Sequence, residues 1–217
     1  LPGAFMGAMF PVMSRAYGKN RSASDFQKLY TQAIKLMFII GLPIALGLNM
    51  LSYEITSFLW PNYDKGTIDS ALKYLAWTCG LVFLSTVVVT GFRALDKRLG
   101  FTILIGTTTV LNIALNLFLI PRYSHVGTSI TMIFTEGYLL TAGLIYIGRN
   151  VTFPNEFGFI PKSILGALCM GLFLFLLKNR LHVLIIIPLA GIVYLGFILL
   201  LFGDIRKSLN MKFKELL

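Results

Sequence analysis

The feature that most constrains this chain is a series of long apolar runs that carry almost no charge. The clearest run, from Leu99 to Ile120, contains no charged residue at all. A transmembrane helix needs about 20 mostly apolar residues, so a run of this kind can cross a bilayer. Hydrophobic residues make up 56% of the chain and charged residues 13%, a balance that would expose large apolar patches in water. These runs therefore predict an integral membrane protein.

Marking each uncharged run and its ends predicts seven helical segments. The first, from Leu1 to Ser14, is expected to be a helix cut short by the start of the chain. The six complete segments, the first of them entered from a capping box at Ser24, are Leu36–Tyr53, Tyr74–Phe92, Leu99–Ile120, Thr128–Gly148, Phe159–Leu177 and Leu181–Phe202. The predicted fold class is an all-α integral membrane bundle of one truncated and six complete transmembrane helices.

The basic residues indicate an orientation for this bundle. The formal net charge is +10, and 14 of the 19 Lys and Arg residues fall in one alternate set of loops. Cytoplasmic loops retain Lys and Arg, so the chain is expected to be a multi-pass protein of the plasma membrane with its C-terminus in the cytoplasm. Basic residues placed between apolar runs suit lipid headgroups, whereas a nucleic-acid surface would gather them on one polar face. Membrane lipid is therefore an expected partner, and nucleic acid is not.

The sequence holds none of the motifs that mark common enzymes. It has no metalloprotease H-E-x-x-H, no G-x-S-x-G and no phosphate-binding G-x-x-x-x-G-K-[ST]. Cys79 and Cys169 both lie inside apolar runs and form no metal-binding spacing. We therefore expect no enzymatic activity, no catalytic residue, no metal site and no bound cofactor.

Glu136 is the most informative polar residue, because it lies near the middle of an apolar segment. An ionised carboxylate there costs at least about 2.5 kcal/mol on insertion scales and must face protein or water. One interpretation is a proton or cation site, or a carboxylate that lines a transport cavity. The other is a structural glutamate that ties two helices together by hydrogen bonding.

Four further residues are candidates for a transport path. Asn112 and Asn116 are four residues apart and so share one helix face, where they could join helices or line a polar path. Thr135 precedes Glu136, although a threonine in lipid often bonds its own backbone. Arg93 closes an apolar run, where it could engage a phosphate group or act as an interfacial anchor.

Several stretches of the chain resemble a known family. They are residues 1–15, residues 54–63 and above all the run from Leu111-Asn112 through Asn116 to Ile120-Pro121, followed by Gly127 and Thr131. These stretches resemble the polysaccharide-biosynthesis flippases, which export O-antigen and teichoic-acid precursors, of the multidrug/oligosaccharidyl-lipid/polysaccharide exporter superfamily. Members have about fourteen helices in two lobes, and Glu136 falls where they often carry an acidic residue.

The resemblance implies a division of the chain. Residues 1–148 would form the second transport lobe, 149–202 the final helix pair and 203–217 a basic cytoplasmic tail. The first lobe, an expected partner, would lie outside this chain. The whole protein would flip a lipid-linked oligosaccharide or polysaccharide precursor by alternating access, with coupling to a proton or sodium gradient. A multidrug/cation antiporter of the same superfamily and a membrane-embedded glycolipid transferase are the alternatives.

Overall fold

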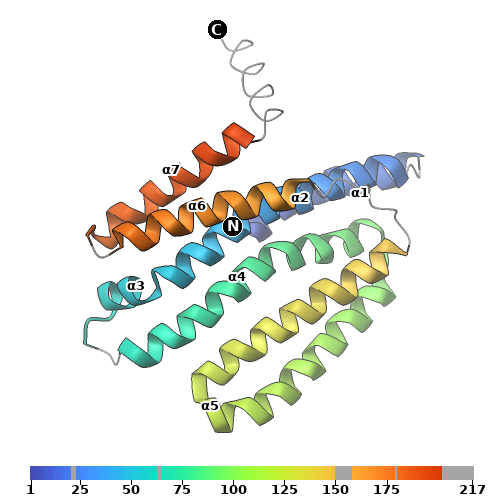
Figure 1. Cartoon of the computed structure of the whole chain (residues 1–217). Coiled ribbons are helices and arrows are strands. Elements are labelled where there is room, and N and C mark those ends of the chain that lie inside the picture. The colour runs from blue at the N-terminus through green and yellow to red at the C-terminus, as the bar shows by residue number, and fades with distance from the viewer. Residues whose placement is uncertain (21–22, 63–64, 150–157, 179, 202–217) are drawn as a thin grey trace.

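The computed structural model describes residues 1–20, 23–62, 65–149, 158–178 and 180–201, and every regular element in these ranges is a helix (Figure 1). The helices are α1 (Pro2–Asn20), α2 (Ala23–Met50), α3 (Ser52–Leu59), α4 (Lys65–Ala94), α5 (Arg98–Gly148), α6 (Phe159–Leu177) and α7 (Val183–Leu201). Ser124 divides α5 into two arms, because its backbone is not helical (φ 49°, ψ −130°). The predicted all-α membrane bundle is confirmed.

Five of these helices, α2, α4, α5, α6 and α7, are long and apolar enough to cross a membrane. The 51 residues of α5 are enough for two crossings, one by each arm, since a helix rises about 1.5 Å per residue and a bilayer core is about 30 Å thick. The described part of the chain therefore contains six spanning segments, as many as the sequence predicts to be complete. The chain is a multi-pass membrane protein.

Helix α4 is the centre of the bundle. It packs against α1, α2, α3 and α5, while α2 carries α6 and α7 on its other side. In Figure 1 the α5 hairpin accordingly lies along one flank of α4, and α6 and α7 lie beyond α2. Among the described elements α5 packs closely only against α4.

Small residues allow these helices to approach closely. A Cβ placed on Gly143 of α5 would lie 2.2 Å from Val88 Cγ1 of α4, and one on Gly91 would lie 2.6 Å from the Tyr30 ring of α2. Lipid tails are as apolar as the side chains, so helix association in a membrane depends on tight packing and on hydrogen bonds between helices. The core around α4 meets both conditions.

The turn between α4 and α5 is fixed by a local motif. Asp96 has a positive φ of 52°, and its amide donates to the carbonyl of Arg93, while the Lys97 amide donates to that of Phe92. This is the Schellman arrangement, which ends a helix on a left-handed residue. Aspartate is one of the few residues other than glycine that tolerates this conformation.

The observed ends of the helices differ from the sequence prediction in one informative place. The predicted segment through Tyr53 is interrupted, since α2 ends at Met50 and Leu51 leaves the helical path (φ −100°, ψ 13°) before α3 begins. A side-chain bond from Ser52 to Asp69 of α4 holds the start of the separate helix. Ser24, predicted as a cap, already lies inside α2. The proposed tail, residues 203–217, is outside the described residues, and the division at residue 148 stays a prediction.

Candidate functional site

Glu136 lies on the second arm of α5 and faces α4. The hydroxyl of Ser85, only 5% exposed, donates a hydrogen bond of 2.6 Å to Glu136 Oε2. Ser85 and Glu136 come from different helices, so this bond joins the hairpin to the centre of the bundle. A hydrogen bond to a carboxylate is shorter and stronger than one between neutral groups.

The two arms of α5 are joined by polar contacts of their own. Asn112 Nδ2 on the first arm lies 3.4 Å from Thr135 Oγ1 on the second, and Asn116 Nδ2 donates to Asn112 Oδ1 at 2.9 Å. About one turn farther from the hairpin tip, the Tyr138 hydroxyl donates to Thr107 Oγ1 at 3.0 Å. Asn112, Asn116 and Thr135 thus contact one another between the two arms, while Glu136, next to Thr135 in the chain, bonds to α4. We name these four residues and Ser85 the polar zone.

One buried acceptor atom of this zone lacks a hydrogen-bond donor among the described residues. Asn116 Oδ1 is buried and accepts no hydrogen bond from the described residues. Thr135, by contrast, donates to the carbonyl of Thr131 at 3.0 Å, the backbone bond that threonines in lipid commonly make.

Arg93 lies apart from the other four. Its side chain is exposed in the last turn of α4, with the guanidinium 5.4 Å from the centre of the Phe101 ring. Eight residues separate it from Ser85 on the same helix, a rise of about 12 Å. This position, beside the exposed Asp96–Arg98 ion pair, is that of an interfacial residue. The structure does not bring Arg93 into the polar zone.

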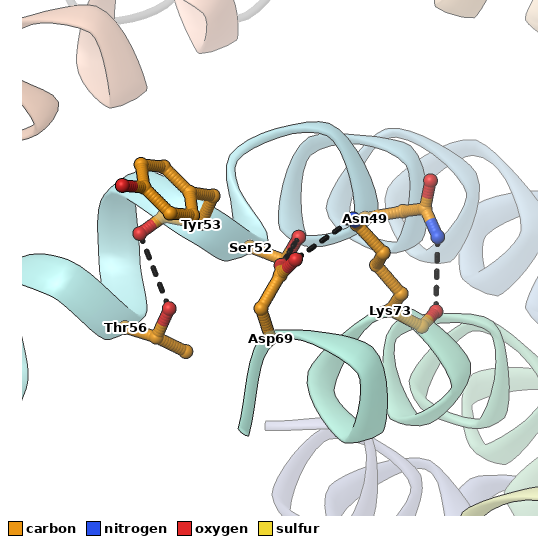
Figure 2. A network of polar contacts seen from close by, with 6 residues as sticks. All are labelled: Asn49, Ser52, Tyr53, Thr56, Asp69 and Lys73. Atoms are coloured by element: carbon orange, nitrogen blue, oxygen red, sulfur yellow. Dashed lines mark hydrogen bonds and ion pairs between the residues drawn. The ribbon is translucent and has the colours of Figure 1, made fainter. Parts of the chain in front are cut away.

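A second polar network was not predicted from the sequence. Figure 2 shows Asn49 and Ser52, from the end of α2 and the start of α3, beside Asp69 and Lys73 of α4. Asp69 is 8% exposed and accepts from the Ser52 hydroxyl and, at 2.8 Å, from Lys73 Nζ, while Asn49 Nδ2 donates to the Lys73 carbonyl at 2.9 Å. The spacing of Asp69 and Lys73, four residues apart, was the available signal. We name these four residues the junction network.

The described residues contain no group of three or more His, Cys, Asp or Glu side chains that could hold a metal ion. The polar zone offers one carboxylate, two amides and hydroxyls inside an apolar bundle. Such an arrangement can bind, relay or reposition a small ion, and it can couple the α5 hairpin to α4.

Comparison with known proteins gives a consistent result. A family model described as "Lipid II flippase MurJ" matches residues 3–185. The chain is 25% identical over 188 residues to the "Probable lipid II flippase MurJ" of Rickettsia prowazekii, covering 81% of this chain and 36% of that protein. It is 27% identical over 164 residues to the protein of the same description from Haemophilus influenzae, covering 70% of this chain and 31% of that protein. The chain thus spans about a third of the length of these relatives.

A solved structure shares the fold. The chain is similar to "Lipid II flippase MurJ, inward closed conformation" with a TM-score of 0.79 and 19% identity, over 95% of this chain and 45% of that one. The resemblance stated above is correct for the superfamily and for a flippase. It is corrected for the family, because the matching model is the lipid II flippase and not the polysaccharide exporter. The diffuse Asn, Pro and Gly pattern of residues 111–131 does not distinguish the two. The chain belongs to the MurJ lipid II flippase family, a family of transporters and not of enzymes.

Proposed function

We propose that this chain is part of a flippase that moves lipid II, the lipid-linked precursor of peptidoglycan, across the cytoplasmic membrane. The family match over residues 3–185 carries this proposal. Because the chain spans about a third of its curated relatives, the remaining helices of the transporter come from outside these 217 residues. In this proposal they form the first lobe, and residues 1–148 form most of the second.

The mechanism we infer is alternating access, in which the two lobes rock about a central path. Helix α4 transmits this movement to the α5 hairpin, which packs on no other described helix. Glu136, Asn112, Asn116 and Thr135 are proposed to serve the transport path or its ion coupling. Arg93 is proposed as a headgroup anchor on the cytoplasmic side, the side to which the charge count also assigns the C-terminus.

The bundle also offers a place for the apolar part of such a substrate. An apolar cavity of 340 Å³ opens between α2, α6 and α7, with Pro43, Met170 and Tyr194 among its lining residues. Cavities of about 300–1,000 Å³ hold small ligands in proteins. A lipid tail that moved with its headgroup could remain in this apolar cavity while the headgroup crossed.

The proposal is tested by rescue of a bacterium whose own lipid II flippase is depleted. The full-length protein that contains this chain is expected to restore growth and the exposure of lipid II on the outer leaflet. Glu136→Ala is expected to lose the rescue, whereas Asp25→Asn, an exposed carboxylate at the start of α2, keeps it. Full-length protein that reaches the membrane without restoring either readout would refute the function.

A further inference from the structure

A second apolar groove lies between α2 and α4, and its α2 residues Phe38 and Leu42 also border the α6–α7 cluster. It has a volume of 520 Å³ and is lined by Phe38, Leu42 and Ala45 of α2, by residues of α4 from Tyr74 to Leu84, and by Ile133 of α5. We name it the α2–α4 groove. It shares no lining residue with the cavity between α2, α6 and α7, so it is a separate site.

The groove runs along one face of α4. Lys73, Trp77 and Leu81 follow one another at intervals of four residues, which places them in a row on that helix. The part of α4 that lines the groove, from Tyr74 to Leu84, advances ten residues, a rise of about 15 Å. One leaflet of a bilayer contributes about half of the 30 Å hydrocarbon thickness, so the groove is as long as one leaflet is deep.

The end of the groove at Lys73 has the chemistry of the membrane interface. Tyr74 and Trp77 are 40% and 44% exposed, and such aromatic residues gather at the level of the headgroups. The Lys73 side chain is 50% exposed, and Asp69 Oδ2 accepts one of the three hydrogens of its ammonium group. The junction network therefore holds a cation one residue before Tyr74, the first α4 residue that lines the groove.

We propose that the α2–α4 groove binds a membrane glycerophospholipid, with one acyl chain along Trp77, Leu81 and Leu84 and the phosphodiester at Lys73. An apolar trough one leaflet deep fits an acyl chain, and the ammonium group complements a phosphate oxygen. Lys73 shares its charge with Asp69, so the site recognises the phosphodiester and not a particular headgroup. The bound lipid would cover the junction between α2, α3 and α4. The proposal is independent of the flippase function and goes beyond it.

The first experiment locates the lipid. A photo-crosslinking benzoylphenylalanine is placed at Leu81, inside the groove, or at Phe175, an exposed position on α6 outside both cavities. The full-length protein is purified with 1-palmitoyl-2-oleoyl-phosphatidylglycerol, washed, irradiated and analysed by mass. We expect a phospholipid adduct at Leu81 that exceeds the adduct at Phe175 at least fivefold after washing. Equal yields at the two positions, or an adduct with lipid II alone, would overturn the proposal.

The second experiment separates the lipid contact from folding. Lys73→Gln is expected to lower phospholipid retention in native mass spectrometry by roughly five- to tenfold, since it removes a charge-assisted hydrogen bond. Lys73→Arg and Lys28→Gln, an exposed lysine near the start of α2, are expected to retain lipid as the parent does.

Asp69→Asn distinguishes a lipid site from a purely structural ion pair. It releases Lys73 from its partner, so a lipid site predicts unchanged or greater retention. If Asp69→Asn lowers retention as much as Lys73→Gln does, or if Lys73→Gln has no effect, the assignment of the phosphodiester to Lys73 is wrong.

Discussion

Replacing Ser85 with alanine removes the hydroxyl that donates to Glu136 across the interface between α4 and α5. Interhelical hydrogen bonds in a membrane protein contribute about 0.6 kcal/mol on average and about 1.7 kcal/mol at most. This bond is short, 2.6 Å, and its acceptor is a carboxylate, so its contribution should lie near the upper value. We expect a coupling free energy of about 1.5 kcal/mol between the two side chains.

The coupling is measured with a double-mutant cycle of Ser85→Ala and Glu136→Ala. Unfolding of the purified protein in detergent, followed by tryptophan fluorescence, gives the free energy for each corner of the cycle. Thr141→Ala paired with Glu136→Ala is the control, because the Thr141 hydroxyl bonds the carbonyl of Gly137 in its own helix at 2.8 Å. A coupling below about 0.3 kcal/mol for the Ser85 cycle, equal to that of the control, would refute the attachment of α5 to α4 through this bond.

Three further changes test the fold. Ser124→Gly relieves a positive φ of 49° at the hairpin tip, so thermal unfolding should show a gain of about 1 kcal/mol, and a loss would contradict the strained turn. Gly143→Ala places a Cβ 2.2 Å from Val88 and should cost about 1–3 kcal/mol in the same assay, whereas Gly137→Ala, with open space around it, should cost nothing. Tyr194→Phe removes a buried hydrogen bond of 2.7 Å from α7 to a carbonyl of α2 and should cost about 1 kcal/mol; no loss would show that α7 needs no such tie.

The membrane helices could be predicted from the sequence because bilayer thickness alone fixes their length. The charge-free run from Leu99 to Ile120 and the run from Thr128 to Gly148 correspond to the two arms of α5. The break at Leu51 could not be predicted, because no proline or glycine lies within three residues of it. It depends on the contact between Ser52 and Asp69, which are 17 residues apart in different helices.

The candidate site was predictable only in part, for a similar reason. An acidic residue in an apolar run can be recognised from the sequence as a candidate site residue, since lipid cannot stabilise its charge. Its hydrogen-bond partner cannot be recognised in this way, because Ser85 is one hydroxyl among many in the chain and lies 51 residues from Glu136. Asn112 and Asn116 could be placed on one face by their spacing, but their contact with Thr135 required the hairpin. Arg93 was grouped with these residues by type, and the helix geometry separates it from them.

Hydrogen bonds within and between the described helices account for part of the polarity inside the spanning segments, whereas Glu136 keeps acceptor positions that they do not fill. Threonines such as Thr109 donate to a carbonyl of their own helix. The Asn112 amide contacts Thr135 on the other arm, which gives it a partner where the bilayer offers no water. A carboxylate offers about four acceptor positions, of which the Ser85 hydroxyl fills one. A residue kept only to join α4 to α5 would not need this excess, because glutamine accepts the same hydrogen bond without a charge.

Glu136→Gln therefore separates the two interpretations. A purely structural role predicts that this variant keeps both the free energy of unfolding and the flipping activity. A transport role predicts unfolding within about 0.5 kcal/mol of the parent together with a loss of flipping, because the bond survives and the charge does not. Full activity in Glu136→Gln and in Glu136→Ala would leave the residue with no role in transport, and the path would then have to be sought on the other helices of the protein.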